Sequence, residues 1–465
     1  MEAIPVNMNK CYHLIGIGGI GMSGIAQLLL RRGFKVSGSD LKENEITADL
    51  ARAGAKIFIG HNSVNIAAAQ VIIYSSAIKE DNPEIIEAKR QGVPLLKRAQ
   101  GLAQLMQGKV VITVTGSHGK TTTTSLVSCL LLSAGLLPTV AVGGIIKNID
   151  NNACLGEGKF FVAEADESDG SFLHYSPKYS IITNIDREHL DYYQEFKNAV
   201  QAFRKFIKRT DKDGCIFYCL DDPNLRKIIS GYKNRAVSFG LRAGARIHPG
   251  NIVLEGLSCE FDCYEDNKFL ERFTLSLGGR HNICNCLSVI ALGRELGIDL
   301  GSIKKALKGY QGSRRRLEVK FGGPPVCVID DYAHHPTEIK ATLLAAKNVA
   351  HKRMIGVFQP HRYSRTKLLL DEFCASFDSL DCLIITDIYP AGEYPEQGVD
   401  ARLIFEKIKK RKTAPREVYL VPKQELVDYV SGLKKDGDLI LTLGAGDITK
   451  VCDELVEKIK GQAKS

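Results

Sequence analysis

The sequence predicts an α/β protein of three domains built mainly on parallel sheets. Short runs rich in β-branched residues alternate with helical patterns, which is typical of successive strand–helix–strand units. The length of 465 residues corresponds to about three domains at roughly 150 residues each. Two glycine-rich turns lie about a hundred residues apart, and each is suited to the phosphates of its own ligand. The chain is therefore expected to bring two phosphorylated ligands together.

Ten segments carry the strand pattern and account for most of the predicted sheets. They are CYHLIGI from residue 11, KVSGSD from 35, VIIYSSA from 71, KVVITVT from 109, KFFVAEA from 159, YSIITNI from 179, VCVIDDY from 326, RMIGVF from 353, CLIITDI from 382 and DLILTLG from 438. Domain breaks are expected near Gly108, just before the strand that leads to the second glycine turn, and near Gly312, after a helical region. The predicted domains are residues 1–108, 109–312 and 313–465.

The composition excludes several classes of protein. With 44% hydrophobic and 25% charged residues, the chain is close to an average folded globular protein. A formal net charge of +9 favours anionic ligands, but the basic clusters Arg314 to Arg316 and Lys409 to Lys412 lack interleaved aromatic residues, so no nucleic-acid partner is predicted. The second cluster is expected to be a solvated helix face.

The cysteines and the apolar segments point to a cytoplasmic protein without membrane insertion. The 13 cysteines include no CxxC pair and are expected to be reduced thiols. The start of the chain lacks the ordered regions of a signal peptide. The longest apolar region, residues 126–146, is interrupted by serine, glycine and proline, as in a buried helix followed by a strand.

The first glycine turn is GIGGIG, between a predicted strand and a predicted helix. Gly16, Gly18, Gly19 and Gly21 would let the backbone approach a pyrophosphate at the helix N-terminus. Asp40 ends the next strand, where a ribose or base is expected. Taken alone, this turn would also fit a nicotinamide dehydrogenase, or a tight connection without a ligand.

The second turn, TGSHGKTTTT at residues 115–124, is more specific. Its amides from Gly116 to Thr121 are suited to phosphate oxygens, Lys120 to the β- and γ-phosphates, and the Thr121 hydroxyl to magnesium. The standard phosphate loop would have glycine at Val114. This departure points away from motor and switch ATPases.

Acidic residues and a histidine follow the next two predicted strands. Glu164 and Asp166 lie in AEADESD, and His189 lies in DREHLD. The carboxyl ends of parallel strands beside a phosphate loop are where a metal bound to ATP needs ligands. Acidic loop tips are commonly only solvated and a single histidine is commonly structural, but their position after the loop favours a metal site.

Together these motifs resemble the Mur ligase family over essentially the whole chain. The resemblance rests on GIGGIGM, TGSHGKTTTT, EADESD, TNIDREHLD, GRHNICN, DDYAHHPTE, PHRYSRT and a terminal LGAGD. Small departures are Ser117, where the family usually has threonine, and Arg187 and Glu188, where relatives often have alanine and aspartate. A nicotinamide dehydrogenase would leave the second turn without a role, and a regulatory nucleotide-binding module would not explain the polar strand ends of the third domain.

The resemblance implies an ATP-dependent ligase of peptidoglycan precursor synthesis. It would join L-alanine to the lactyl carboxylate of UDP-N-acetylmuramate through an acyl phosphate, as a monomer or homodimer. The first domain would be Rossmann-like and bind the UDP-sugar, the central one would be a P-loop-like ATPase domain, and the last would be Rossmann-like, bind the amino acid and close on ATP. The nearest alternative is a family member that adds a different amino acid or a preformed peptide to the same UDP-sugar.

The resemblance also implies roles for single residues. The UDP-sugar positions are Gly16, Gly18, Gly19, Asp40, His61, Ser75, Ser76 and Ala77. The ATP positions are Gly116, Ser117, His118, Gly119, Lys120, Thr121 and Thr122, with His281, Asn282 and Asn285 at the adenine, Arg314 or its neighbour at the phosphates, and Asp330 or Asp331 at the ribose. Thr121, Glu164 and His189 would bind Mg²⁺, and Lys120, Glu164 and His189 are the expected catalytic residues.

The segment GVFQPHRYSRT is expected to bind the amino acid. A strand is predicted to end at Phe358 and a helix to begin near Ser364. Arg362 and Arg365 are three residues apart, so their guanidinium groups can face one spot. With His361 they are expected to hold a carboxylate. The alternative is that the arginines pair with Asp371 and Glu372.

Overall fold

The computed structural model describes residues 10–462, whose strands form three sheets. All ten predicted strand segments form strands, and each of these strands pairs in parallel with at least one neighbour. By internal contacts the chain divides into two compact units. One runs to Gly250 and includes Cys263–Glu271 and Cys284–Tyr310, and the other holds Asn251–Asp262, Arg272–Ile283 and the chain from Gln311 on.

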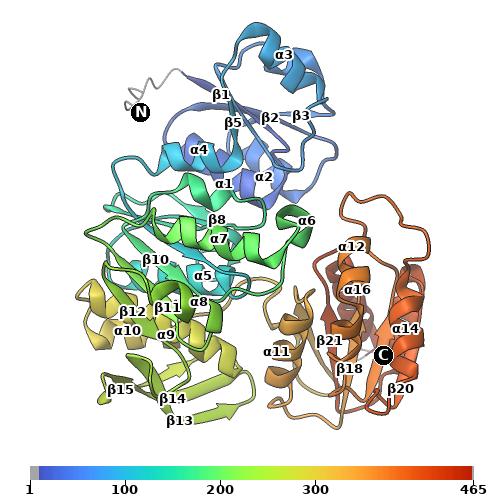
Figure 1. Cartoon of the computed structure of the whole chain (residues 1–465). Coiled ribbons are helices and arrows are strands. Elements are labelled where there is room, and N and C mark those ends of the chain that lie inside the picture. The colour runs from blue at the N-terminus through green and yellow to red at the C-terminus, as the bar shows by residue number, and fades with distance from the viewer. Residues whose placement is uncertain (1–9, 463–465) are drawn as a thin grey trace. The chain divides into compact units, whose positions relative to one another are not determined.

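The first sheet, in the blue part of Figure 1, has five parallel strands in the order β3-β2-β1-β4-β5. Its elements are β1 (Cys11–Ile15), α1 (Ile20–Arg31), β2 (Lys35–Asp40), α2 (Glu45–Arg52), β3 (Lys56–Ile59), η1 (Ser63–Ile66), β4 (Val71–Tyr74), α3 (Pro83–Gln91), β5 (Leu95–Lys97) and α4 (Arg98–Leu105). The strand order reverses at β1, between β2 and β4. Because ligands of such sheets bind at the carboxyl end of the reversal point, the first glycine turn after β1 lies where a ligand is expected.

The second sheet has ten strands in the order β15-β14-β13-β12-β11-β10-β6-β9-β7-β8. Its strands are β6 (Val110–Thr115), β7 (Thr139–Ile146), β8 (Asn151–Cys154), β9 (Phe160–Glu164), β10 (Tyr179–Ile182), β11 (Cys215–Cys219), β12 (Ala236–Phe239), β13 (Ile247–Glu255), β14 (Ser258–Glu265) and β15 (Lys268–Leu275). The accompanying helices are α5 (Lys120–Ser133), η2 (Ser171–His174), α6 (Leu190–Tyr193), α7 (Phe196–Ile207), α8 (Pro223–Ile229), α9 (Arg280–Glu295) and α10 (Leu300–Lys308). β6 pairs in parallel with both β9 and β10, so the loops that follow these three strands are neighbours.

The third sheet has six strands in the order β16-β17-β21-β18-β19-β20. Its elements are β16 (Glu318–Phe321), β17 (Cys327–Asp331), α11 (Pro336–Ala346), β18 (Arg353–Phe358), α12 (Tyr363–Leu368), α13 (Leu370–Cys374), β19 (Cys382–Ile385), α14 (Ala401–Lys409), β20 (Glu417–Leu420), η3 (Lys423–Glu425), α15 (Leu426–Leu433), β21 (Asp438–Leu443) and α16 (Ile448–Gln462). β16 is antiparallel to β17, and the other pairings are parallel. Buried aliphatic residues of the sheet and of α15 and α16, such as Val328, Ile440 and Leu455, form one core cluster.

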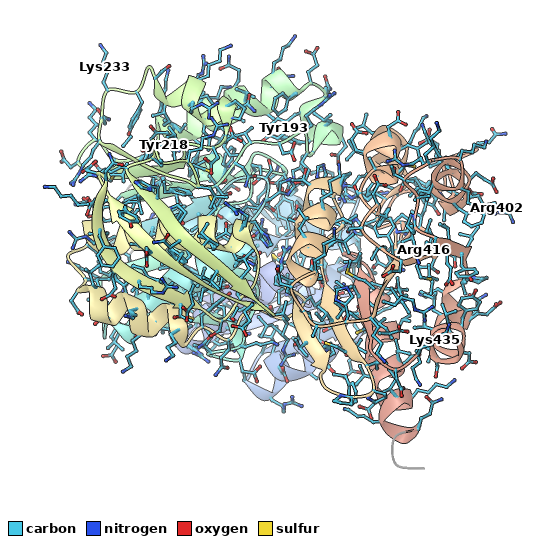
Figure 2. All side chains as sticks on the ribbon, turned by 90° about the horizontal axis from the view of Figure 1, so that it is seen from below. Tyr193, Tyr218, Lys233, Arg402, Arg416 and Lys435 are labelled. Atoms are coloured by element: carbon cyan, nitrogen blue, oxygen red, sulfur yellow. The ribbon has the colours of Figure 1, made fainter. Side chains whose placement is uncertain are left out.

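Surface features agree with the composition. Lys409, Lys410 and Lys412 are exposed, which confirms the prediction that they are solvated, but α14 ends at Lys409 and Arg411 is half-buried against Asp378. Charged side chains such as Lys233 and Arg402 project from the surface (Figure 2). Among the residues described, no helix combines the length and the apolar character that crossing a bilayer requires.

Candidate active site

The second glycine turn joins β6 to α5 in a conformation that requires glycine. Gly116 and Gly119 have φ of +131° and +81°, which side chains rarely adopt. A Cβ at Gly116 would lie 2.1 Å from Thr183 Oγ1. Gly119 is the N-cap of α5, which begins at Lys120. The turn therefore presents backbone amides at the positive end of a helix, as an anion site needs.

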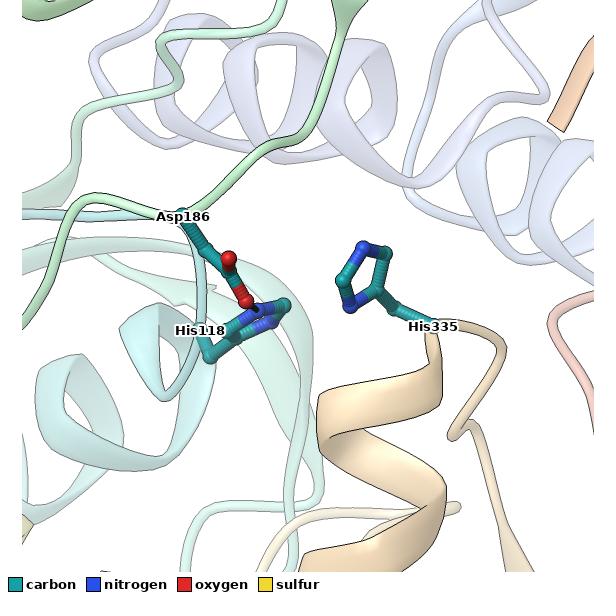
Figure 3. Close-up of side chains that lie close together, drawn as sticks. All are labelled: His118, Asp186 and His335. Atoms are coloured by element: carbon teal, nitrogen blue, oxygen red, sulfur yellow. Dashed lines mark hydrogen bonds and ion pairs between the residues drawn. The ribbon is translucent and has the colours of Figure 1, made fainter. Parts of the chain in front are cut away.

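The segment after β10 fixes the shape of this turn. The His118 amide donates to Asn184 Oδ1 (2.8 Å), and the Asp186 amide donates to Ser117 Oγ (2.9 Å). The His118 ring Nε2 lies 2.9 Å from Asp186 Oδ2 (Figure 3), and Thr183 Oγ1 donates to the His118 carbonyl (2.6 Å). The sequence predicts a role only for His189 of this segment, because side-chain bonds to a backbone leave no spacing pattern.

Lys120 lies among carbonyl and carboxylate oxygens. Its Nζ donates to the Gly116 carbonyl (2.8 Å), to the Ser117 carbonyl (3.2 Å) and to Glu167 Oε1 (2.8 Å). Burial lowers the pKa of Lys120, but the charges of Glu167 and other carboxylates outweigh it and raise the pKa above its ordinary value. The lysine is therefore a permanent cation at the turn.

Glu164 ends β9 and faces the start of α5. Its Oε2 accepts hydrogen bonds from Thr121 Oγ1 (3.0 Å) and from the Gly143 amide (3.0 Å). Burial raises the pKa of Glu164 above its ordinary value, against the opposing effects of Lys120 and the Gly143 amide. The two predicted metal ligands Thr121 and Glu164 thus lie in direct contact.

His189 lies in a second acidic group, which contains a residue that the sequence analysis missed. Its Nε2 is 3.5 Å from Glu167 Oε1 and 3.8 Å from Glu188 Oε2. Burial lowers the pKa of His189, but Glu167 and Glu188 together raise it above its ordinary value. Glu167 is 2% exposed, and its Oε2 has no hydrogen-bond partner within residues 10–462. The signal for Glu167 was its place in the acidic run after β9, from which only Glu164 and Asp166 had been chosen.

These groups fit a hard divalent cation. The candidate ligand atoms of Glu167, Glu188 and His189 lie within 4.8 Å of one another. Oxygen donors dominate, which is the preference of Mg²⁺. Glu188, one of the small departures from the family pattern, is itself part of this group.

The first glycine turn is held by fewer side chains. Gly16 has φ of +80°, and the Gly18 amide donates to Asp40 Oδ2 (2.8 Å). A Cβ at Gly18 would lie 2.9 Å from that oxygen, so Asp40 and the turn require each other. Ser75, Ser76 and Ala77 follow β4, and the Ser75 amide donates to the Ile15 carbonyl (3.1 Å).

A cavity of about 350 Å³ extends from the first turn to the acidic end of β9. Its lining includes Gly19, Ser75, Arg98, Glu164 and Asp166. Arg98 Nη2 lies 3.6 Å from Asp166 Oδ2. Arg98 is not predicted as a binding residue from the sequence, because a single arginine at the start of a helix belongs to no motif.

His61 is oriented by a buried carboxylate. Its Nδ1 lies 3.0 Å from Ser39 Oγ and 3.4 Å from Glu84 Oε2. Glu84 is fully buried and also accepts from Ser39 Oγ (2.6 Å) and Asn65 Nδ2 (2.6 Å). Burial raises the pKa of Glu84, but hydrogen bonds from His13, Ser39 and Asn65 outweigh it and lower the pKa to about 2. The carboxylate therefore stays charged.

Helix α9 carries the three residues expected at the adenine. Asn285 packs against the second turn, since a Cβ at Gly119 would lie 2.7 Å from Asn285 Oδ1. Asn282 Nδ2 donates to the Gly278 carbonyl (2.8 Å). Burial, with Arg316, lowers the pKa of His281 to about 4, so this ring is neutral at pH 7.

In the other unit, the strand end of β17 is densely bonded. Asp330 is fully buried, accepts from Thr442 Oγ1 (2.6 Å) and Thr449 Oγ1 (2.9 Å), and lies 3.3 Å from Arg315 Nε. Burial raises the pKa of Asp331 to about 6. Arg314 is exposed. The predicted ribose and phosphate contacts of Asp330 and Arg314 stay predictions.

The same strand end leads to α11. His335, also drawn in Figure 3, is the N-cap of α11, and its Nδ1 accepts from the Thr337 amide (3.3 Å).

The predicted amino-acid segment has the expected local structure. β18 ends at Phe358 and α12 begins at Tyr363. Arg365 Nη1 donates to His361 Nδ1 (3.1 Å). Burial, together with His334 and the arginines, lowers the pKa of His361 to about 2, so its ring is a neutral acceptor. Asp371, an alternative partner for the arginines, forms an ion pair with Lys407.

Comparisons with known proteins agree along the whole chain. Three family models match in succession: Mur ligase family, catalytic domain, at residues 11–110; Mur ligase middle domain at 114–293; and Mur ligase, glutamate ligase domain, at 315–446. The UDP-N-acetylmuramate–L-alanine ligase of Geotalea uraniireducens is 45% identical over 450 residues, which are 97% of this chain and 98% of that protein. The protein of the same name from Syntrophus aciditrophicus is 45% identical over 474 residues, 99% and 98% of the two chains. The crystal structure of UDP-N-acetylmuramate-alanine ligase MurC from Thermotoga maritima superposes with a TM-score of 0.83 at 31% identity, covering 97% of this chain and 99% of that one.

Proposed function

Since this chain belongs to the Mur ligase family, we propose that it is an ATP-dependent ligase that joins L-alanine to the lactyl carboxylate of UDP-N-acetylmuramate. The observation that carries the proposal is the cavity that extends from the first glycine turn to Glu164 and Asp166, beside the phosphate loop. Such a cavity suits a nucleotide sugar whose reactive carboxylate must reach the phosphate of a second nucleotide. The 45% identical relatives named for this reaction support the same assignment.

We assign the three substrates to three domains. Residues 1–108 would bind the UDP-sugar, 109–312 ATP, and 313–465 the amino acid. The thirteen cysteines, all free thiols, suit the reducing cytoplasm, where all three substrates would be available.

The first turn would hold the pyrophosphate of the UDP-sugar. The Gly18 amide donates to Asp40 and the Gly19 amide to the Gly16 carbonyl, so the anion would lie against the first turn of α1 beyond them, where the helix dipole favours a negative charge. Arg98 would add a full positive charge inside the cavity. His61, held by Glu84, and Asp40 would contact the uridine side, so that this domain binds without taking part in bond changes.

The second turn would hold the triphosphate of ATP. The Ser117 and His118 amides donate to Asn184, so the amides of Gly119, Lys120 and Thr121 would contact phosphate oxygens. Lys120, kept charged by its carboxylate neighbours, would face the transferred group. Asn285, packed on Gly119, would position the base. Positioned charges of this kind stabilise the transition state of phosphoryl transfer.

Mg²⁺ fits the oxygen-rich groups described above. Thr121, Glu164, Glu167 and His189 would hold it, and the buried Glu167 Oε2 without a hydrogen-bond partner is the observation that favours this assignment. Bound Mg²⁺ supplies additional neutralisation of phosphate charge.

The chemistry follows from the low reactivity of a carboxylate toward an amine. A lactyl carboxylate oxygen attacks the γ-phosphorus of ATP, the bond to ADP breaks, and an acyl phosphate forms. The neutral amine of L-alanine then attacks the acyl carbon, and inorganic phosphate leaves with that oxygen as the amide forms. The chain's contribution is to hold the reactants in contact and to neutralise charge with Lys120 and Arg98.

The amino acid would be held by its own carboxylate. Arg365 lies on the first turn of α12 and donates to neutral His361, which keeps its guanidinium in one orientation. Arg362 would provide the second fork. Paired guanidinium groups suit a carboxylate and leave the amine free to attack.

Phosphate release with a panel of substrates tests the proposal. Purified chain, ATP and Mg²⁺ should release phosphate rapidly only when UDP-N-acetylmuramate and L-alanine are both present. Faster release with another amino acid or with a preformed peptide would assign the chain to a different ligase of the family. Release with the UDP-sugar omitted would reject the proposal.

A further inference from the structure

Two cysteines that no role above uses meet at the carboxyl end of β11. Cys219 ends this strand, Cys284 lies in α9, and their Sγ atoms are 3.6 Å apart although the residues are 65 positions apart in sequence. A metal site is predicted from sequence only where cysteines lie close together in the chain. Pairing across this distance leaves no CxxC spacing, so the pair was missed.

Asp221 adds a third ligand atom to the pair. The two sulfurs and an Asp221 carboxylate oxygen lie within 4.8 Å of one another. The carboxylate accepts from the Leu241 amide (2.6 Å) and the Arg242 amide (3.3 Å), which fix its orientation. Metal-binding carboxylates are typically held by such outer contacts.

Positive charge lies beside this group. Arg242 Nε is 3.7 Å from Asp221 Oδ1, and Arg226 Nη1 donates to the Leu220 carbonyl (2.6 Å). These guanidinium groups offset part of the negative charge that two thiolates and a carboxylate would carry.

The spacing of the sulfurs matches a shared metal ion. Two thiolates at about 2.3 Å from a tetrahedral Zn²⁺ lie ~3.8 Å apart, close to the 3.6 Å found here. A disulfide would require the sulfurs to approach to about 2.05 Å. The geometry at hand is therefore nearer to a metal site than to a disulfide.

We propose that Cys219, Cys284 and Asp221 form a binding site for a thiophilic divalent cation such as Zn²⁺ or Cd²⁺. Two metal–sulfur bonds form as the two thiol protons pass to solvent. The site differs in chemistry from the group of Glu167, Glu188 and His189, because thiolates select soft cations whereas carboxylates suit Mg²⁺. The proposal rests on these contacts and does not depend on the proposed ligase activity.

X-ray absorption of the Zn²⁺-loaded full-length chain tests the ligands directly, with excess Mg²⁺ and ATP present to occupy the oxygen-rich groups. The expected spectrum contains sulfur neighbours at about 2.3 Å. A spectrum with only nitrogen and oxygen neighbours would overturn the proposal. This measurement uses the wild-type chain, so it stands even where a cysteine variant fails to fold.

Titration with Cd²⁺, followed by thiolate-to-metal charge-transfer absorption, provides the second test. Cys219→Ser and Cys284→Ser should each weaken binding by about 100-fold or more, and Asp221→Asn by about 10-fold. Cys11→Ser, which removes another partly exposed thiol, should leave the titration unchanged. Equal affinity in the wild type and in both Cys219→Ser and Cys284→Ser would reject the site.

Discussion

The two glycine turns begin from the same backbone plan and differ in what surrounds them. Each follows a strand that pairs in parallel with both of its neighbours, and each opens a helix. Around the first turn, Asp40 accepts from Gly18 and Asn44 contacts the Gly18 carbonyl. Around the second, Thr183, Asn184 and Asp186 bond to the turn, and Lys120 at the end of the turn is paired with the buried Glu167.

The different contacts around the two turns indicate what each turn is suited to do. Helix-end amides alone suffice to hold an anion that does not react. A phosphoryl group in transfer also needs fixed charge placed before the reaction, which costs no reorganisation during it. The second turn, which more side chains hold and which carries a fixed charge, is therefore suited to take part in the chemistry, whereas the first is suited to binding alone.

The largest effect is expected from Lys120→Ala. The substitution removes the cation of the second turn and should lower the rate of phosphate release by on the order of 10² to 10⁴. Circular dichroism checks that the fold is kept. Lys109→Ala, which removes a half-buried lysine just before β6 whose Nζ donates to the Gly158 carbonyl (2.6 Å), is the control and should release phosphate at nearly the wild-type rate. A near wild-type rate in Lys120→Ala would mean that this turn takes no part in the reaction.

The buried carboxylate of Glu84, which orients His61 in the first domain, is expected to contribute to the free energy of unfolding. Glu84→Gln removes a buried carboxylate whose pKa falls from 4.5 to about 2 on folding. A lowered pKa stabilises the folded chain above pH 4.5, and this stability is lost as the pH falls from 4.5 toward 2. The variant should be less stable by on the order of 3 kcal/mol at pH 7, and the gap to the wild type should narrow below pH 4.5.

Urea unfolding of the wild type and Glu84→Gln at several pH values measures this gap. Glu45→Gln, in an exposed position on α2, serves as the control. A gap that is independent of pH would mean that packing, not the charge of Glu84, stabilises the domain.

Glu167→Gln tests whether the acidic group beside the second turn binds Mg²⁺. The change keeps the size of the side chain but removes its charge, so the Mg²⁺ concentration that gives half-maximal rate should rise by about 10- to 100-fold. Mn²⁺ binding measured by electron paramagnetic resonance provides a readout that does not depend on turnover. Asp169→Asn, in the same acidic run, should have little effect. An unchanged Mn²⁺ affinity in Glu167→Gln would make Glu167 only a partner of Lys120.

Arg365→Ala tests a region outside both turns. Loss of one charged hydrogen bond worth about 1.5 to 3 kcal/mol should raise the KM for L-alanine by roughly 10- to 100-fold, while the KM for ATP moves little. Lys367→Ala, on the exposed face of the same helix, is the control. If instead the KM for ATP rises and that for alanine stays constant, Arg365 belongs to the nucleotide.

The smallest effect is expected from Asp40→Ala. It removes the acceptor of the Gly18 amide, a neutral-donor contact worth about 1 kcal/mol, so the KM for the UDP-sugar should rise by roughly 5-fold with kcat unchanged. A fall in kcat without a change in KM would show that the first turn takes part in the chemistry after all.

The sequence predicted the strands and turns well, since β-branched runs and glycine motifs are local signals. The end of β18 at Phe358 and the start of a helix near Ser364 were predicted from such patterns, and α12 begins at Tyr363. Roles that depend on tertiary contacts were not predicted: Glu167 lies in the EADESD motif, but its contacts with Lys120 and His189 depend on the fold, and Arg98 lies in no motif. Cys219 and Cys284 are close only because β11 and α9 meet in the fold.

The most direct test of the account follows one oxygen atom. UDP-N-acetylmuramate labelled with ¹⁸O in its lactyl carboxylate is incubated with the chain, ATP, Mg²⁺ and L-alanine, and the released phosphate is examined by mass spectrometry. One labelled oxygen is expected to pass to inorganic phosphate as the L-alanyl amide forms, because ATP at the second turn phosphorylates the lactyl carboxylate of the UDP-sugar whose pyrophosphate lies at the first turn. Amide formation with unlabelled phosphate would contradict it.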